Sequence, residues 1–169
     1  LWGLGVYYRC FGRYTQEQVM ETAAAFRREK LPCAVIGLEP GWQTRSYSCS
    51  FVFDRDRFPD PEGMTAALRE MGFHVNLWEH AFTHPESPLY EPLYPYSGDF
   101  LVWDGLVPDF AGEEAPRLFA EYHRRRLVEK GIDGFKLDEC DGSDFTGSWS
   151  FPDTAVFPSG LEGDRMHSL

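Results

Sequence analysis

The chain has 169 residues, of which 43% are hydrophobic and 16% aromatic, which is enough apolar material for one buried core. Its formal net charge of −11 argues against a nucleic-acid backbone or an anionic membrane as a partner. No apolar run reaches the roughly 18 residues that a membrane span requires. The four cysteines lack the paired spacing of a zinc site, so we expect neither a zinc site nor a disulfide framework. We expect no cofactor.

The first half of the chain predicts alternating strands and helices. Residues 1–8 (LWGLGVYY) predict a strand, and residues 14–30 predict a helix for which Thr15 can serve as the N-cap. Leu31 and Pro32 end that helix. The continuous apolar run 33–39 (CAVIGLE) is typical of a parallel strand that is covered on both faces.

The same alternation continues further along the chain. Asp60 and Pro61 open a second helix, which Gly72 closes. A third strand is predicted at 73–81 (FHVNLWEHA), a third long helix at 112–131, and a fourth strand at 134–139.

Two segments depart from this pattern. Residues 82–111 are rich in Pro, Tyr and Gly and predict a long irregular excursion, whereas the tail from Cys140 to Leu169 is rich in loop residues, with a short helix expected near Glu162. The order of elements favours a parallel α/β sheet. A doubly wound sheet is the alternative, but the Gly-rich phosphate turn typical of that fold is missing.

We therefore predict a (β/α)8 TIM-barrel fragment in which residues 1–169 form about the first four βα units. Four units cannot close such a barrel. The chain also begins with LWGLG rather than Met, so we expect it to be part of a longer protein.

In such barrels the chemistry lies at the C-terminal ends of the strands. Those ends carry Glu39 with Trp42, Trp78 with His80, and Lys136 with Asp138. Residues two apart in a strand face the same way, so the last two pairs should each point into one mouth. Carboxylates that accept hydroxyl hydrogens, next to aromatic rings that stack on C–H faces, suit a polyhydroxylated sugar ring.

Each of these residues also has a purely structural interpretation. Glu39 could cap the following loop, and a lone Trp78 is more often part of a core than a platform. Lys136 and Asp138 could form an ordinary salt bridge inside the barrel. A metal site at His80 is disfavoured, because no second His or Cys stands at ligand spacing. Because all of these residues occur together at the ends of predicted strands, we favour the functional interpretation.

Six segments, taken in order, resemble the first half of the catalytic barrel of glycoside hydrolase family 31, the retaining α-glycosidases. GIDGFKLDECD (131–141) resembles the family's nucleophile block, and VWDGLVPDFAGEEA (102–115) resembles its "WpG...pDF" segment. The other four are LWGLGVYYRCFGRYTQEQV (1–19), LPCAVIGLEPGWQ (31–43), FVFDRDRFPDPEGMTAALREMGFHVNLWEHAF (51–82) and FPSGLEGDRMHSL (157–169). The galactoside-cleaving relatives share part of this pattern, but the WDGLVPDF segment favours family 31.

The resemblance implies a role for each matching position. Asp138 falls on the catalytic nucleophile, and Lys136 gives the F-K-x-D form seen in α-xylosidase-like members. Glu39 falls on an acid that binds sugar hydroxyls. Trp78 and Trp103 fall on the −1 pocket, and Phe11 on an aromatic wall. The substrate-binding candidates are Phe11, Glu39, Trp42, Trp78, His80, Trp103, Lys136 and Asp141.

Departures from the family pattern affect the sugar pocket. Glu39 stands in place of Asp, Gly41 in place of a second acid, and His80-Ala81 in place of an acid or amide followed by Pro. Glucose specificity therefore does not carry over.

A retaining glycosidase needs two carboxyl groups about 5–5.5 Å apart. We expect the Lys136 ammonium to keep Asp138 ionised, and we expect the acid/base carboxyl beyond Leu169. Asp141 and Asp144 are alternatives for that role, but they directly follow the nucleophile strand and suit loop ordering or substrate contact better.

The partner we expect is a small-molecule or oligosaccharide α-glycoside, with no nucleic acid and no membrane; a homo-oligomer and the cellular compartment remain open. Two alternatives stand beside the glycosidase. One is a non-catalytic carbohydrate-binding relative with a degenerate site. The other is a metal-dependent aldolase or isomerase on the same barrel, which would require paired metal ligands at strand ends that the sequence does not show.

Overall fold

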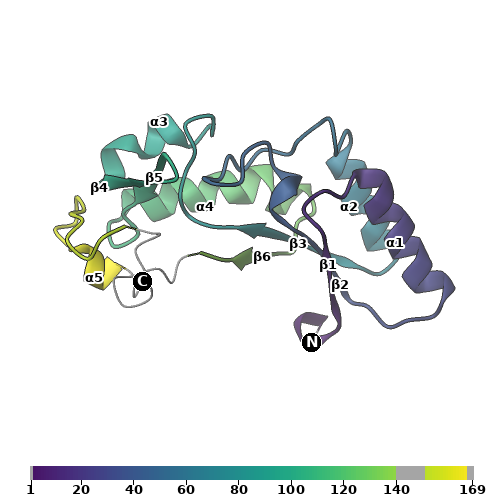
Figure 1. The fold of residues 1–169 in the computed structure, drawn as a ribbon. Coiled ribbons are helices and arrows are strands. Elements are labelled where there is room, and N and C mark those ends of the chain that lie inside the picture. Colours follow the sequence, from purple (N-terminus) through teal and green to yellow (C-terminus); the bar gives the residue numbers. More distant parts are fainter. Residues whose placement is uncertain (1, 140–150, 167–169) are drawn as a thin grey trace. The chain divides into compact units, whose positions relative to one another are not determined.

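The structure is a computed structural model that describes residues 2–139 and 151–166. Its chain divides into two compact units. The first unit comprises Leu1–Thr44, Val52–Trp78 and Arg125–Lys136; the second comprises Arg45–Phe51, Glu79–Arg124 and Leu137–Leu169. Figure 1 labels the elements of both units.

The main sheet has four strands, which are β1 (Tyr7–Cys10), β2 (Val35–Leu38), β3 (His74–Glu79) and β6 (Gly134–Leu137), in the order β1-β2-β3-β6. The pairs β1–β2 and β2–β3 are parallel. The bonds from Asp133 N to Val75 O and from Asp138 N to Glu79 O advance together along β6 and β3, so this pair is parallel as well. The predicted arrangement of four parallel neighbours in chain order is therefore confirmed, and it is that of a (β/α)8 barrel fragment.

Two amphipathic helices connect the first three strands. Helix α1 (Gln16–Arg28) begins with a capping box, in which Thr15 Oγ1 accepts from Gln18 N and the Gln18 side chain accepts from Thr15 N. Helix α2 (Pro61–Glu70) begins at Pro61, and the Asp60 side chain caps it by accepting from Gly63 N. Both predicted helix starts are confirmed within two residues.

The core of the first unit lies where these helices meet the sheet. Strand β2 is buried along its whole length, as its continuous apolar sequence predicts. The fully buried members of this core include Val19 and Ala23 of α1, Leu68 of α2, Ile36 of β2 and Leu77 of β3. Apolar residues thus reach the same core from every βα element of the unit.

The predicted first strand starts too early. Residues Trp2–Leu4 form a short 3-10 helix, and β1 begins only at Tyr7. Gly5 N donates to Trp2 O, which turns the chain back on itself, and the Trp2 ring stacks on His74 at 4.0 Å between centroids. Residues 2–5 therefore adopt this local turn instead of the extended conformation of a strand.

The predicted irregular excursion at 82–111 is wrong in part, because it contains regular structure. Strands β4 (Ser97–Val102) and β5 (Gly105–Pro108) form an antiparallel hairpin, which follows α3 (Tyr90–Leu93) and the 3-10 helix η3 (Tyr94–Tyr96). A separate apolar core supports the second unit. Its buried members are Phe82, Val102, Val107, Phe151, Ala155, Phe157 and Met166.

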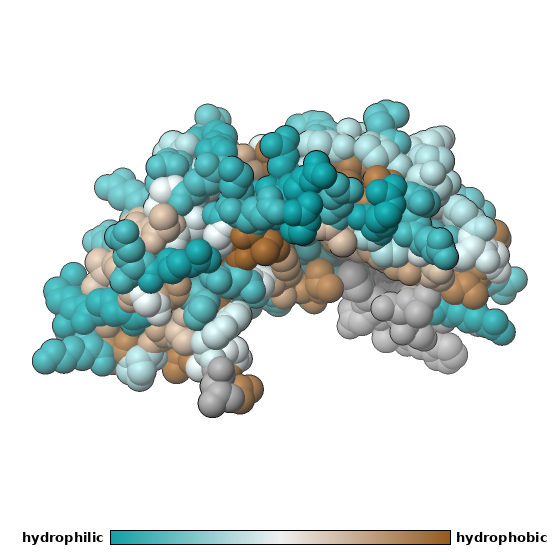
Figure 2. Space-filling model, turned by 180° about the vertical axis from the view of Figure 1, so that it is seen from behind, coloured by the Kyte–Doolittle hydropathy of each residue, from teal (hydrophilic) through white to brown (hydrophobic). Residues whose placement is uncertain are grey.

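The remaining elements complete the described chain. Helix α4 (Glu114–Arg126) is the predicted third long helix. The 3-10 helix η4 (Val128–Lys130) follows it and ends at Gly131, which adopts a left-handed backbone with a φ of 101°. A 3-10 turn, η2 (Pro40–Trp42), follows β2. Helix α5 (Gly163–Met166) begins one residue after Glu162, as predicted. The face shown in Figure 2 is mainly hydrophilic, in keeping with a charged surface.

Candidate active site

The candidate nucleophile directly follows β6. The backbone N–H of Asp138 donates to Glu79 O, at the end of neighbouring β3, over 2.9 Å. Its own Oδ1 accepts from Glu139 N at 3.1 Å, and the side chain is half-buried. Glu139 has a φ of 60°, so the chain turns sharply just after the nucleophile position. The end of β6 therefore holds a carboxylate at the edge where barrel enzymes carry out their chemistry.

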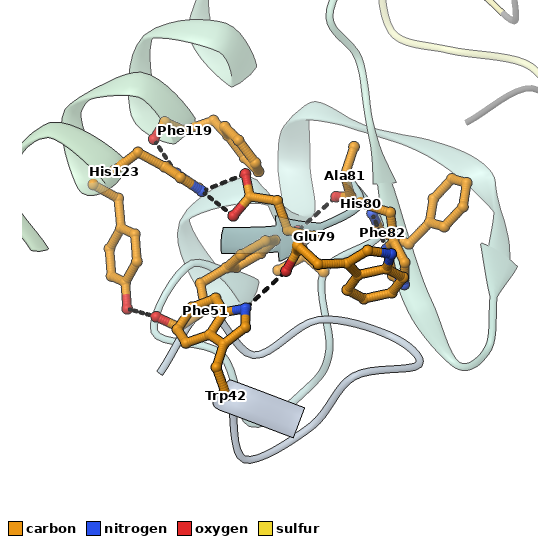
Figure 3. Close-up of polar contacts among 11 residues, drawn as sticks. Trp42, Phe51, Glu79, His80, Ala81, Phe82, Phe119 and His123 are labelled. Carbon is orange, nitrogen blue, oxygen red and sulfur yellow. Dashed lines mark hydrogen bonds and ion pairs between the residues drawn. The ribbon is translucent and has the colours of Figure 1, made fainter. Parts of the chain in front are cut away.

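An aromatic cluster in the second unit surrounds His80. The imidazole is fully buried, and its ring centroid lies 5.8 Å from that of Tyr47, 5.1 Å from Phe82 and 5.2 Å from Trp103. Phe82 N donates to His80 Nδ1 at 3.2 Å, a contact drawn in Figure 3. Since Nδ1 accepts, the proton of the neutral ring lies on Nε2.

Two groups of this cluster have displaced pKa values. Burial lowers the pKa of His80 to about 4, and a hydrogen bond with the Ser46 backbone and the charge of Asp138 offset only part of that effect. Burial raises the pKa of Tyr47 to about 12, helped by the charges of Glu139 and Asp138. The Tyr47 hydroxyl donates to Glu139 Oε1 at 3.3 Å. At neutral pH the cluster therefore presents a neutral imidazole and a protonated phenol beside two carboxylates.

The tip of the β4–β5 hairpin places Trp103 against His80. Trp103 and Asp104 form a two-residue turn with φ values of 49° and 60°, the combination that a type I′ hairpin requires at both central positions. Ser48 Oγ donates to Trp103 O at 3.2 Å. Gly105 is required here, because a Cβ at that position would overlap the Ser48 side chain.

A second group of candidates gathers in the first unit. Phe11, Glu39 and Trp42 line one small crevice beside the ends of β1 and β2. The Arg57 guanidinium fixes its walls by donating to Gly12 O, Tyr14 O and Gly41 O at 2.6–2.8 Å. The loops after both strands are thus tied to one cation.

Glu39 does not act as a loop cap, which was its structural interpretation. It occupies the N-cap position of η2, but its side chain makes no capping hydrogen bond. Glu39 Oε1 lies 3.3 Å from Arg9 Nε, within ion-pair range, and it has no hydrogen-bond partner among the described residues. A buried carboxylate oxygen without a hydrogen bond suits a ligand hydroxyl.

The other candidates differ in how far their side chains are exposed to solvent. Trp42 and Trp78 are each 1% exposed, and Trp42 Nε1 donates to Trp78 O at 2.7 Å, so Trp42 braces the strand end. Lys136 lies within β6 and is half-buried, whereas Phe11 is 65% exposed. Asp141 and Asp144 lie outside the described residues. The structure thus groups Asp138, His80 and Trp103 in one unit and Phe11, Glu39 and Trp42 in the other; their convergence on one pocket stays a prediction.

Sequence reasoning missed two residues of the Asp138 environment, Tyr47 and Glu139. Glu139 follows the nucleophile position directly and could have been proposed from that adjacency alone. Tyr47 stands in a polar loop, RSYSCS (45–50), without periodicity, so nothing in its local sequence indicates that it meets Glu139, 92 positions further on.

The second unit also contains an apolar cavity of about 430 Å³. None of the described residues that line it carries a titratable side chain, and we do not assign the cavity to the chemistry. Its lining includes Phe82, Phe110, Phe119, Leu137 and Met166. Among the described residues, no three His, Cys, Asp or Glu side chains are grouped as a metal site would need, and no helix has the length and apolarity to cross a membrane.

The chain is similar to a known protein family and to characterised proteins. The family model described as the TIM-barrel domain of glycosyl hydrolases family 31 matches residues 1–169. An alpha-xylosidase of Emericella nidulans is 28% identical over 167 residues, covering 92% of this chain and 20% of the relative. An alpha-xylosidase of Lactiplantibacillus pentosus is 27% identical over 138 residues, covering 74% and 18%. The chain spans about a fifth of the length of these relatives.

Solved structures show the same fold. An alpha-xylosidase from a soil metagenome, complexed with xylose, superposes with a TM-score of 0.75 at 22% identity, covering 92% of this chain and 24% of that one. A cycloalternan-degrading enzyme from Trueperella pyogenes, in complex with a covalent intermediate, gives a TM-score of 0.78 at 22% identity, covering 99% and 27%.

Proposed function

Because the chain belongs to the TIM-barrel domain of glycosyl hydrolases family 31, we propose that its full-length protein is a retaining α-glycosidase with Asp138 as the nucleophile. The observation that carries the proposal is the position of Asp138. It directly follows a barrel strand, at the edge used for chemistry, and its charge acts on two groups with displaced pKa values, His80 and Tyr47.

The reaction divides into two displacements. A carboxylate oxygen of Asp138 attacks the anomeric carbon, and the bond from that carbon to the leaving oxygen breaks as an acid protonates the oxygen. The sugar is then held as an ester on Asp138. Water, deprotonated by the same acid/base group, attacks the anomeric carbon and releases both the sugar and the Asp138 carboxylate, so the configuration is retained.

The surroundings of Asp138 suit that role. Burial keeps His80 neutral, so no imidazolium competes with the anomeric carbon for the negative charge of the nucleophile. The Tyr47 hydroxyl keeps its proton and can donate to a carboxylate or a sugar oxygen. Trp103 adds an aromatic surface beside both groups, on which the C–H face of a sugar can stack.

We assign the acid/base role to a carboxyl group outside residues 1–169. Glu139 is an unsuitable acid, because it follows Asp138 directly in the chain and accepts a hydrogen bond from Tyr47. On this proposal a protein consisting of residues 1–169 alone does not hydrolyse glycosides.

We propose an α-linked pentose or hexose as the substrate, with α-xylosides placed first. The curated relatives named alpha-xylosidase and the F-K-x-D sequence at Phe135–Asp138 support this order. A panel of aryl α-glycosides (xyloside, glucoside, galactoside and N-acetylgalactosaminide) offered to the full-length protein would rank the sugars.

Trapping of the intermediate tests the proposal itself. A 5-fluoro glycosyl fluoride of the preferred sugar should form a stable covalent adduct, because the fluorine slows breakdown of the ester. Peptide mapping should place the added mass on Asp138. A label on Glu139, Asp141 or Asp144 would contradict the nucleophile assignment. Sugar binding without any adduct or turnover would favour the non-catalytic carbohydrate-binding relative.

A further inference from the structure

A buried pair of titratable side chains lies next to the nucleophile strand, and the reaction described above does not use it. Glu79 is the last residue of β3 and is 1% exposed, and His123 of α4 is 6% exposed. His123 Nε2 lies 3.1 Å from Glu79 Oε1 and 3.2 Å from Oε2. Figure 3 draws both contacts. Burial of two such groups costs free energy and is weak evidence for stabilisation, so the pair calls for another explanation.

Hydrogen bonding fixes the number of protons that the pair holds. His123 Nδ1 lies 2.8 Å from Phe119 O, and since a carbonyl oxygen only accepts, Nδ1 carries a proton. The short contacts between Nε2 and the carboxylate then require a second proton, whether on the imidazole or on Glu79. Either way, a hydrogen bond joins α4 to the end of β3.

The imidazole itself has little freedom to move. Its ring stacks on Phe119 at 4.0 Å with an angle of 20° between the planes, and the Phe51 ring meets it edge-on at 5.1 Å. Tyr122, the neighbouring residue on α4, donates through its hydroxyl to Phe51 O. The ring is therefore a fixed point against which Glu79 is held.

Glu79 connects this fixed point to the nucleophile. Its side chain is bound to His123, while its main-chain oxygen accepts the N–H of Asp138 at 2.9 Å. We propose that the Glu79–His123 pair is a positioning device that sets the backbone of Asp138 for attack on the anomeric carbon. The inference rests on the proposed function, and it adds two residues that do not touch the substrate.

Single truncations in the full-length protein give the first test. His123→Ala and Glu79→Ala should each lower kcat by about 100-fold, the cost of a misplacement of roughly 1 Å, with KM within about threefold of its original value. Glu79→Gln should keep kcat within about threefold, because the amide can donate to Nε2 of a neutral His123 and preserve the tie. A purely structural role would not separate kcat from KM in this way.

A double variant guards against simple loss of folding. Glu79→Leu/His123→Phe replaces the pair with apolar side chains, a change that is often neutral or stabilising for buried ion pairs. We expect it to fold, as judged by circular dichroism and thermal unfolding, and still to show the loss in kcat. A folded double variant with unchanged kcat overturns the inference. So does a double variant that cannot fold, because the pair is then a requirement of the fold.

Asp138→Ala separates this inference from the proposed function. If Asp138→Ala keeps turnover, the nucleophile assignment fails. If Asp138→Ala abolishes turnover while folded Glu79→Ala and His123→Ala remain fully active, only the positioning role fails.

Discussion

The two units of the chain are built in opposite ways. The first is assembled mainly from consecutive βα elements whose apolar faces meet in one core, whereas the second draws on separated segments that include a hairpin and short helices. Four of the five non-glycine residues with positive φ in the described chain lie in the second unit: Phe51, Trp103, Asp104 and Glu139. Strained backbone thus gathers in the unit that contains Asp138, as is common where function requires a fixed geometry.

Groups with displaced pKa values, in contrast, occur in both units. Burial raises the pKa of Cys10, in the core of the first unit, to about 12. In the second unit the displaced groups His80 and Tyr47 also feel the charge of Asp138. Burial is thus the leading cause in both units, and the displaced groups differ in the carboxylate beside them, which is Glu39 for Cys10 and Asp138 for His80 and Tyr47.

The largest effect should come from the second unit and should leave stability almost unchanged. Asp138→Ala in the full-length protein should lower kcat by at least about 1,000-fold, because no covalent path remains, while ground-state sugar contacts persist. Initial rates with the best aryl glycoside and the affinity for the free sugar would measure the two effects. Ordinary turnover in this variant would contradict the assignment of Asp138 as the nucleophile.

The converse change belongs to the first unit. Leu68→Ala in α2, at a fully buried position, should lower the free energy of unfolding by about 2–5 kcal/mol through lost contacts and a residual cavity. Leu4→Ala, at a residue that is 88% exposed, is the matched control and should change it by less than about 0.5 kcal/mol. Urea unfolding of both variants makes the comparison. Equal effects would mean that the core of the first unit is not packed as described.

The smallest effect concerns His80 and depends on pH. Since burial lowers its pKa from 6.5 to about 4, the unfolded chain takes up a proton more readily than the folded chain between these values. The full stability is present above pH 6.5 and is lost progressively as the pH falls towards 4, by at most about 3 kcal/mol. Urea unfolding at pH 7.5 and pH 4.5 measures this loss, which should shrink in His80→Gln. An equal loss in that variant would assign the pH dependence to other groups.

The sequence predicts the first unit well because its signals are local. Apolar spacing, the Thr15 and Asp60 caps and the continuous apolar run of β2 each act within a few residues, and the structure bears them out. Parallel order followed from the alternation of elements. The first strand was misplaced because a turn at Gly5, which depends on a single backbone hydrogen bond, leaves little trace in the apolar pattern.

Helices α4 and α5 of the second unit were predicted, but its hairpin and its side-chain pairs were not, because those contacts depend on residues distant in sequence or on an unusual turn. The hairpin turn is Trp103-Asp104 rather than the Asn-Gly or Asp-Gly pair that would signal it. Tyr47 meets Glu139, and Glu79 meets His123 across 44 positions, without any periodicity to indicate either pair. Asp138 became a candidate from the sequence because its position at a strand end combined with a family motif, whereas the residues that surround it required the structure.

The Trp103-Asp104 turn has a consequence for protein engineering. Each of these residues adopts a left-handed backbone at a cost of about 1–3 kcal/mol, which glycine would largely avoid. A redesign guided by thermostability alone would therefore select glycine or asparagine at the tip of this hairpin. It would gain a more stable scaffold and discard the indole that packs on His80. The stability of the hairpin and the proposed sugar pocket therefore favour different residues at position 103.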